Sequence, residues 1–142
     1  MVGYVAELIG ADYPKHALGI GKPENLVRAY LAGYEIFDCV IPTRDARHKR
    51  LYTFKDYDGV TTRDDLSGDL YKYIYMQDEI HIKDFGPIER GCDCHTCTNH
   101  SRSYLHHLFK INDTLANRLA TIHNLRFYTR LIDKLREIDD KE

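Results

Sequence analysis

Three of the chain's four cysteines fall within the six residues CDCHTC, as Cys92, Cys94 and Cys97. A C-x-C-x-x-C spacing brings three thiolates within reach of one point, which is the arrangement that a tetrahedral zinc site requires. Spacing alone leaves the fourth ligand open among His95, His106, His107 and His123. The alternative is a redox-active or incidental cysteine cluster. We predict Zn2+ in a structural role, because four protein ligands leave no open position for a water.

The length of 142 residues fits one ordinary domain, and a hydrophobic content of 43% supports a core. The net charge of −2 gives no global attraction for nucleic acid, so RNA binding would depend on a local basic patch. No apolar run is long enough to span a bilayer, and the N-terminus lacks the apolar segment of a signal peptide. The clustered cysteines favour a reducing compartment, so we expect a cytoplasmic protein with no membrane partner.

The first fifty residues are predicted to form a strand–helix–strand unit. A short helix over residues 2–9 precedes an apolar strand over residues 16–21. Pro23 then marks the first turn of a helix that Gly33 ends. A second apolar strand is expected over residues 34–41. So tight a run favours parallel strands joined by a right-handed crossover.

Asp38 is the unusual residue of the second predicted strand. A carboxylate in an apolar strand costs free energy unless it is hydrogen-bonded or faces a cleft at a strand end. A buried structural aspartate and a functional one both fit this pattern. The segment that follows, from Arg44 to Arg50, carries four fixed positive charges and one negative. Its arginines could hold phosphates or bases, or could belong to a solvated loop.

The remainder of the chain divides into a β-rich part and a helical part. Residues 51–54 and 59–62 are predicted to form a hairpin around an acidic turn, and a strand or two is expected between 71 and 82. Carboxylates between Asp56 and Asp84 disfavour contact with a phosphate backbone. Residues 101–110 are predicted to be helical, and Asn112-Asp113 offers the N-cap of a helix of about 26 residues. Its apolar stripe, one residue away from His123, comprises Leu115, Leu119, Ile122, Leu125, Ile132, Leu135 and Ile138.

Five motifs stand in order along the chain: GIGKPE at 19–24, FDCVIPTRDAR at 37–47, CDCHTC at 92–97, SRSYLHHL at 101–108 and TIHNL at 121–125. Together they resemble the C-terminal part of tRNA-guanine transglycosylase, also called queuine tRNA-ribosyltransferase. Five motifs in register are far more specific than a lone GxG or CxxC. That family is a zinc-bearing (β/α)8 barrel that exchanges guanine at the wobble position of the tRNA anticodon for a 7-deazaguanine base.

The resemblance assigns a role to each motif. Asp38 matches the family's catalytic nucleophile, which forms a covalent Asp-ribosyl intermediate. His123 becomes the fourth zinc ligand beside Cys92, Cys94 and Cys97. The residues matched to RNA contact form two groups, a turn made of Gly19, Ile20, Gly21, Lys22, Pro23, Glu24 and Asn25, and a wobble-base segment made of Thr43, Arg44, Asp45, Ala46 and Arg47.

The implied fold is α/β, the C-terminal portion of a (β/α)8 barrel with an inserted zinc-binding subdomain and a long C-terminal helix. Residues 1–50 would supply the last βα units with the nucleophile strand. Residues 51–112 would form the β-rich insert and zinc subdomain, and residues 113–142 the closing helix with the fourth ligand. Such a barrel needs about 250 residues, so the chain resembles a fragment, a split-gene half or a truncated product.

The resemblance implies a pentosyltransferase that is inactive alone, because the family's general acid/base lies in the part not matched here. The expected partners are tRNA, a 7-deazaguanine base as small-molecule substrate, and either a second copy in a homodimer or a separate chain supplying the N-terminal barrel half. The alternative is a non-catalytic, zinc-stabilised module for tRNA binding or subunit pairing. Two features depart from the family: Lys49 stands where glycine is usual, and the acidic segment 56–84 is longer than its counterpart.

Overall fold

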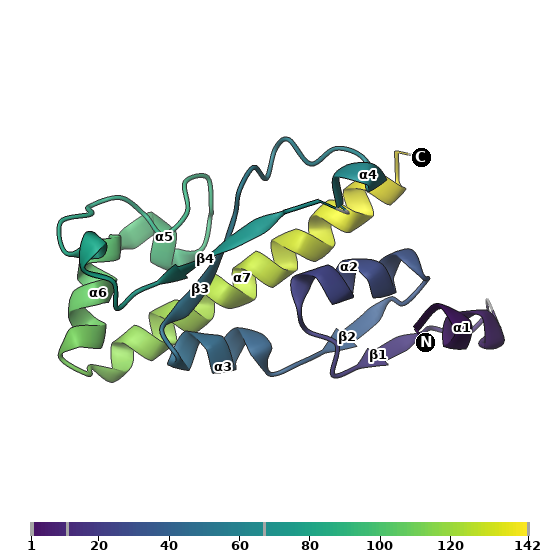
Figure 1. Ribbon diagram of the computed structural model, residues 1–142, viewed down its shortest axis with the longest axis horizontal. Coiled ribbons are helices and arrows are strands. Elements are labelled where there is room, and N and C mark those ends of the chain that lie inside the picture. The colour runs from purple at the N-terminus through teal and green to yellow at the C-terminus, as the bar shows by residue number, and fades with distance from the viewer. Residues whose placement is uncertain (1, 11, 67, 142) are drawn as a thin grey trace.

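Helix α7 (Thr114–Asp139) runs through the molecule, with the first two strands on one side and the second two on the other (Figure 1). The structure is a computed structural model that describes residues 2–10, 12–66 and 68–141. The elements before α7 are, in chain order, α1 (Val2–Leu8), β1 (His16–Leu18), α2 (Pro23–Leu31), β2 (Ile36–Asp38), α3 (Ile41–Arg47), β3 (Arg50–Phe54), α4 (Arg63–Leu66), β4 (Tyr71–Tyr75), the 3-10 helix η1 (Glu79–His81), α5 (His95–Asn99) and α6 (Arg102–Lys110).

Strands β1 and β2 form a parallel pair joined by α2, which confirms the predicted strand–helix–strand unit. Leu18 lies opposite Asp38 in the register, so both strands end at the same edge of the sheet. Pro23 is the first residue of α2, and Gly33 follows the helix with φ of 89°. This left-handed conformation carries little penalty for glycine and ends the helix as predicted.

The second predicted strand is shorter than expected. It covers Ile36–Asp38 rather than residues 34–41, because the chain turns into α3 at Ile41. Pro42 stands in the first turn of α3, where its missing N–H and fixed φ are tolerated. The strand is also less buried than its apolar composition suggested, since Ile36 is 47% exposed.

The predicted hairpin between residues 51–54 and 59–62 is wrong. Strand β3 pairs instead with β4, antiparallel, with Leu51 opposite Ile74 and Phe54 opposite Tyr71. Residues 55–70 form the connection, which contains α4. In that connection Asp65 accepts hydrogen bonds from the backbone N–H groups of Thr61 and Thr62, so residues 61–62 lead into a helix rather than a strand. Between 71 and 82 there is one strand, followed by the short helix η1.

Helix α7 joins two apolar clusters along its length. The first half of the helix packs with α6, β3 and β4 through residues such as Ala116, Leu119 and Ala120. The second half contributes Phe127, Leu131, Leu135 and Ile138 to a cluster with α2, β3 and the β3–β4 connection. The predicted stripe was partly misplaced: Leu125 is 45% exposed, while His123 and Asn124 have no exposed surface. The buried face of α7 therefore includes His123 and Asn124, which the predicted apolar stripe did not contain.

The predicted N-cap of α7 is confirmed, because the Asp113 side chain accepts a hydrogen bond from the Leu115 N–H. The Ser101 side chain caps α6 in the same way, by accepting from the Tyr104 N–H. Lys49 adopts φ of 61°, so the turn between α3 and β3 has the left-handed backbone that favours glycine although a lysine occupies it. Within the described ranges, no helix combines the length and apolar character needed to cross a membrane.

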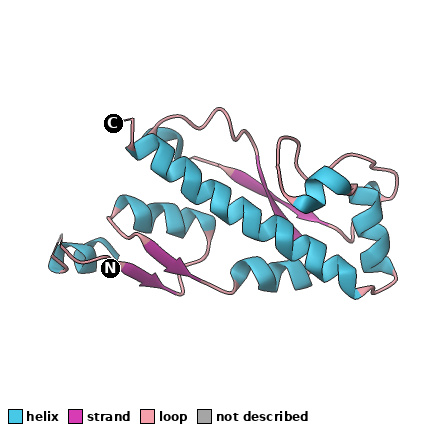
Figure 2. Cartoon of the chain, turned by 180° about the vertical axis from the view of Figure 1, so that it is seen from behind, coloured by secondary structure: helices cyan, strands magenta, loops and turns pink. Residues whose placement is uncertain are grey.

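The architecture agrees with the predicted fold class at a coarse level. It is a mixed helix–strand fold with a long C-terminal helix (Figure 2). The described residues contain two parallel strands and one antiparallel pair, which do not by themselves close a barrel.

Candidate metal centre and candidate active-site edge

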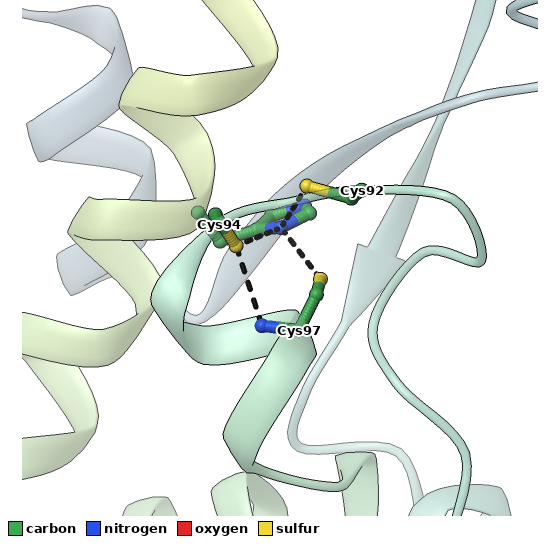
Figure 3. A group of neighbouring side chains, drawn as sticks. Cys92, Cys94 and Cys97 are labelled. Carbon is green, nitrogen blue, oxygen red and sulfur yellow. Dashed lines mark hydrogen bonds between the residues drawn. The ribbon is translucent and has the colours of Figure 1, made fainter.

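The three clustered cysteines are brought together by the short helix α5. Cys94 is the N-cap of this helix and its sulfur accepts a hydrogen bond from the Cys97 N–H at 3.3 Å. Cys92 lies in the loop just before it. Figure 3 shows the three labelled thiols pointing toward one another. The fourth member comes from the middle of α7, where His123 has no exposed surface.

The geometry of these four side chains matches a tetrahedral site. The His123 Nδ1 atom lies 3.9 Å from the Cys92 sulfur, 3.6 Å from that of Cys94 and 3.3 Å from that of Cys97. A tetrahedral Zn2+ with ordinary Zn–S and Zn–N bonds would separate sulfur from nitrogen by about 3.6 Å. All four ligand atoms lie within 4.8 Å of one another, so they could hold one metal ion.

The ring of His123 is oriented for this role. Its Nε2 lies 2.7 Å from the carbonyl oxygen of Tyr52. A carbonyl only accepts, so Nε2 must carry the hydrogen and Nδ1 presents its lone pair to the thiols. A metal-binding histidine typically has its other nitrogen fixed in this way. Strand β3 thus selects the tautomer that the cluster needs.

The pKa values of the Cys94 and Cys97 thiols shift in opposite directions. Hydrogen bonds from Cys92 and Cys97 lower the pKa of Cys94 to about 3. The pKa of Cys97 is raised because it hydrogen-bonds Cys92 and Cys94 and is largely buried. Three thiolates so close together repel one another, and a divalent cation removes that repulsion. The four side chains could therefore hold one such cation.

Two contacts fasten the cysteine loop to α7. The guanidinium of Arg126 binds both carboxylate oxygens of Asp93, at 2.6 and 3.0 Å. The Thr96 hydroxyl donates to the Leu119 carbonyl at 2.7 Å and has no exposed surface. These contacts hold α5 at the level of His123 on α7.

The other candidate histidines lie outside the cluster. His106 is buried and its Nδ1 hydrogen-bonds the Met76 carbonyl at 2.7 Å. His95 contacts the Asn99 amide, and His107 is exposed on α6. Of the four histidines that spacing left open, the structure brings only His123 to the sulfur atoms.

Asp38 stands at the open edge of the parallel pair, where β2 ends. Its Oδ1 accepts a hydrogen bond from His16 Nε2 at 2.8 Å and another from the Gly19 N–H at 3.3 Å. Its side chain is 60% exposed. The sequence identified no partner for Asp38, and the structure supplies two. The carboxylate is therefore not a buried structural group, and it faces outward from the end of a strand.

The first predicted RNA-binding segment forms the turn from β1 into α2. Gly19 has φ of 69°, and a Cβ on Gly21 would lie 2.3 Å from the Cys39 sulfur, so a side chain at either position would be strained. Ile20 is half-buried and Pro23 is buried, while Lys22 and Asn25 are exposed. Glu24 is engaged, since its carboxylate accepts a hydrogen bond from the Tyr71 hydroxyl at 2.9 Å.

The second predicted segment is helical and only partly accessible. Arg44 and Arg47 are exposed on α3, and the Thr43 hydroxyl donates to the Val40 carbonyl. Asp45 and Ala46 are buried, at 1% and 0% exposure, so their side chains are not available to RNA in this structure. Contact of this five-residue segment with RNA stays a prediction.

Asp45 instead joins α3 to β3. Its carboxylate accepts hydrogen bonds from Tyr52, by a very short contact, and from Arg50 at 2.8 Å. Burial acts to raise the pKa of Asp45, but the hydrogen bonds from Arg50 and Tyr52 outweigh it and hold this pKa below its ordinary value of 3.8. The carboxylate is thus a structural anion beneath the exposed arginines.

Sequence reasoning missed Asn124, whose side chain hydrogen-bonds backbone groups on the outer edge of β3. Its Oδ1 accepts from the Tyr52 N–H at 3.2 Å, and its Nδ2 donates to the carbonyls of Arg50 and Pro42, both at 3.0 Å. Glu89 continues along the same edge by accepting from the Phe54 N–H. Backbone N–H and C=O groups left without hydrogen bonds next to the core would cost free energy, and the side chains of Asn124 and Glu89 provide those hydrogen bonds here. The TIHNL motif contained Asn124, but nothing in its spacing indicated this role.

These features define a class: an α/β protein with a Cys3His cluster that could hold a metal ion and, elsewhere in the fold, a parallel strand pair that presents an aspartate. The family model described as queuine tRNA-ribosyltransferase matches residues 1–140, and the chain belongs to this family. A relative named queuine tRNA-ribosyltransferase from Pseudoalteromonas translucida (strain TAC 125) is 42% identical over 136 residues, which cover 96% of this chain and 32% of the relative.

Two further relatives with the same name extend this result. One from Thermoanaerobacter pseudethanolicus (strain ATCC 33223 / 39E) is 38% identical over 137 residues, covering 96% of this chain and 32% of the relative. One from Psychrobacter sp. (strain PRwf-1) is 39% identical over 142 residues, covering 100% of this chain and 34% of the relative. The chain therefore spans about a third of the length of the curated relatives that it matches.

Proposed function

We propose that this chain is the C-terminal third of a tRNA-guanine transglycosylase, a pentosyltransferase that exchanges guanine at the anticodon wobble position for a 7-deazaguanine base. Membership of the family supports the reaction class. The observation that carries the proposal is the exposed carboxylate of Asp38, held at the C-terminal edge of the parallel strand pair. Catalytic groups of (β/α)8 enzymes occupy this edge.

In this proposal Asp38 is the nucleophile. Its carboxylate attacks C1′ of the wobble ribose while the bond from C1′ to the guanine breaks, giving a covalent Asp-ribosyl intermediate. The incoming base then attacks C1′ from the face that guanine left, so the configuration is retained overall. A purine leaving group must be protonated, and the general acid/base is assigned to the remaining two thirds of the relatives' length.

The tRNA is proposed to contact the same edge through two groups of residues. The N-terminus of α2, preceded by the Gly19–Gly21 turn, offers backbone N–H groups and Lys22 to a phosphate. Arg44 and Arg47 are exposed on α3, which follows Asp38 in the chain, and their positive charges would bind tRNA phosphates. Asp45 and Ala46 serve by keeping α3 packed on β3 rather than by touching RNA.

We assign Zn2+ to Cys92, Cys94, Cys97 and His123, whose donor set and sulfur–nitrogen distances fit this ion. When bound, Zn2+ would supply a cross-link between α5 and α7, with no open coordination position for chemistry. The cluster would thereby fix β3, and through it α3, relative to the long helix. This is a structural role at a distance from the Asp38 edge in sequence and in fold.

The remaining two thirds of the relatives' length would complete the barrel around β1 and β2. Leu18 is 76% exposed and Val40 65% exposed, although parallel strands are normally covered on both faces. A groove of about 320 Å3 between β2 and α7, lined in part by Ile20, Phe37 and Ile132, offers further apolar surface. We propose that a homologous barrel portion, in the same polypeptide or in a separate one, covers these surfaces.

We propose that the homodimer expected from the resemblance forms near the metal centre. Phe85 is 80% exposed and Tyr104 is 39% exposed on the surface next to α5 and α6. Large apolar side chains exposed together commonly mark a protein interface. A homodimer formed there would leave the Asp38 edge free.

The decisive experiment uses this chain joined to the N-terminal two thirds of the Pseudoalteromonas translucida relative. Asp38→Asn keeps the shape of the side chain and removes the attacking charge, so exchange of labelled guanine into tRNA should fall by about 10³-fold or more while zinc content is retained. A covalent RNA–protein adduct trapped by denaturation should form with Asp38 and be absent from the variant.

Asp12→Asn is the matched control, because Asp12 is an exposed carboxylate outside both proposed RNA-binding groups. It should leave exchange unchanged. Exchange that survives Asp38→Asn would refute the proposed nucleophile. The 142-residue chain alone should not catalyse exchange, since it lacks the general acid/base and a closed pocket.

A further inference from the structure

His16 and Asp38 form a diagonal pair across the two parallel strands. In the register, His16 lies opposite Ile36 and Leu18 lies opposite Asp38. Side chains two residues apart share a face of a strand, so His16 is the diagonal neighbour of Asp38 on one face of the sheet. The 2.8 Å contact between His16 Nε2 and Asp38 Oδ1 follows from this register.

The two oxygens of the Asp38 carboxylate differ in their environment. Oδ1 receives both hydrogen bonds, from His16 and from the backbone N–H of Gly19 at 3.3 Å. Across residues 2–10, 12–66 and 68–141, Oδ2 has no hydrogen bond. The carboxylate is thus held by one oxygen, and the lone pairs of the other oxygen are free.

We infer that His16 is a positioning residue for the reaction proposed above: together with Gly19 it holds Oδ1 so that Oδ2 is the atom that attacks the ribose. This inference rests on the proposed function of Asp38. As the Oδ2–C1′ bond forms, the C1′–N9 bond breaks and its electron pair leaves with guanine, which is protonated by the general acid of the remaining barrel portion. In the resulting ester, Oδ1 is the carbonyl oxygen and still accepts both hydrogen bonds.

A purely structural role for this pair is disfavoured by its exposure. The His16 side chain is 42% exposed and that of Asp38 is 60% exposed, and ion pairs at such sites contribute little to folding stability. The strand is anchored instead by Ala17, which is 3% exposed. Replacing His16 should therefore alter the orientation of Asp38 without unfolding the strand pair.

The kinetic test uses the joined protein described above with His16→Ala and His16→Gln. Alanine removes the donor, so kcat should fall about 10- to 100-fold with KM for tRNA changed less than about twofold. Glutamine restores an N–H donor, so it should recover most of kcat. Lys15→Gln, the matched control at the residue just before β1, should keep the kcat of the unmodified protein.

A second measurement on the 142-residue chain tests the contact itself. Long-range proton–nitrogen spectra at pH 8 should show His16 mainly as the Nε2–H tautomer, and Asp38→Ala should shift the population toward a mixture. An unchanged tautomer population in Asp38→Ala, or an unchanged kcat in His16→Ala, would overturn the inference. If His16→Ala is fully active while Asp38→Asn is inactive, only the role of His16 fails. If Asp38→Asn is active, the proposed function itself fails.

Discussion

Asn124→Leu should destabilise the chain severely, although it replaces one buried residue by another of similar size. The asparagine has no exposed surface and makes three hydrogen bonds, to the Tyr52 N–H and to the carbonyls of Arg50 and Pro42. Each of the three backbone groups left unpaired costs about 1 to 2 kcal/mol. We therefore expect a loss of about 3 to 6 kcal/mol, which is a large part of the 5–15 kcal/mol roughly available to a domain.

The assay is urea unfolding of the zinc-loaded chain, followed by circular dichroism at 222 nm as a measure of helix content. Asn117→Leu provides a matched control, because Asn117 is exposed on the same helix. Its unfolding free energy should change by no more than about 0.5 kcal/mol, with the higher helix propensity of leucine acting in its favour. A loss below about 1 kcal/mol for Asn124→Leu would show that water or relaxed geometry satisfies the edge of β3, and would refute the reasoning.

Three further predictions concern the metal, the pH and one turn. Metal analysis should find one zinc per chain, and chelation should unfold the part around α5 and α7, because structural zinc contributes on the order of 10 kcal/mol to folding. The His123→Ala variant should lose the metal, whereas His106→Gln and His107→Gln should retain it. Unchanged helicity after chelation would contradict the assignment. The pKa of Asp45 is lower in the folded chain than its ordinary value of 3.8, so Asp45 stabilises the fold above pH 3.8, and this stabilisation is lost as the pH falls through the folded pKa. The unfolding free energy should therefore decline on acidification below about pH 4. If the unfolding free energy of Asp45→Asn declines equally, this carboxylate is not the cause. Lys49→Gly should raise the unfolding free energy by about 0.5 to 1 kcal/mol, because φ of 61° is unfavourable for lysine, and a thermal midpoint below that of the unmodified chain would show that the turn is not strained.

The sequence by itself determined the features that depend on neighbouring residues. Pro23 at the start of α2, Gly33 after its end, and the cap Asp113 act within a few residues of their own position, so their effect could be predicted from the sequence directly. The C-x-C-x-x-C cluster likewise brings its thiols together within a single turn of chain. The family motifs then identified the family to which the chain belongs.

Tertiary structure decided whatever depends on a distant partner. β3 was expected to pair with residues 59–62, but it pairs with β4, because Asp65 organises the nearer segment as a helix start. Asp38 was ambiguous in a strand that looked buried, and its exposure follows from the two-stranded sheet having no further strand among the described residues. The polarity pattern of one strand does not determine how many neighbouring strands will bury it.

The polar residues of α7 show the same division most clearly. His123 and Asn124 lie beside an apolar stripe in the sequence, yet both are buried because β3 presents an unpaired edge to α7. Only the packing of α7 against that edge turns the two side chains into a metal ligand candidate and a backbone partner. Burial of a polar side chain is favourable when its hydrogen bonds are completed by a distant segment, and that segment is set by the fold rather than by local sequence.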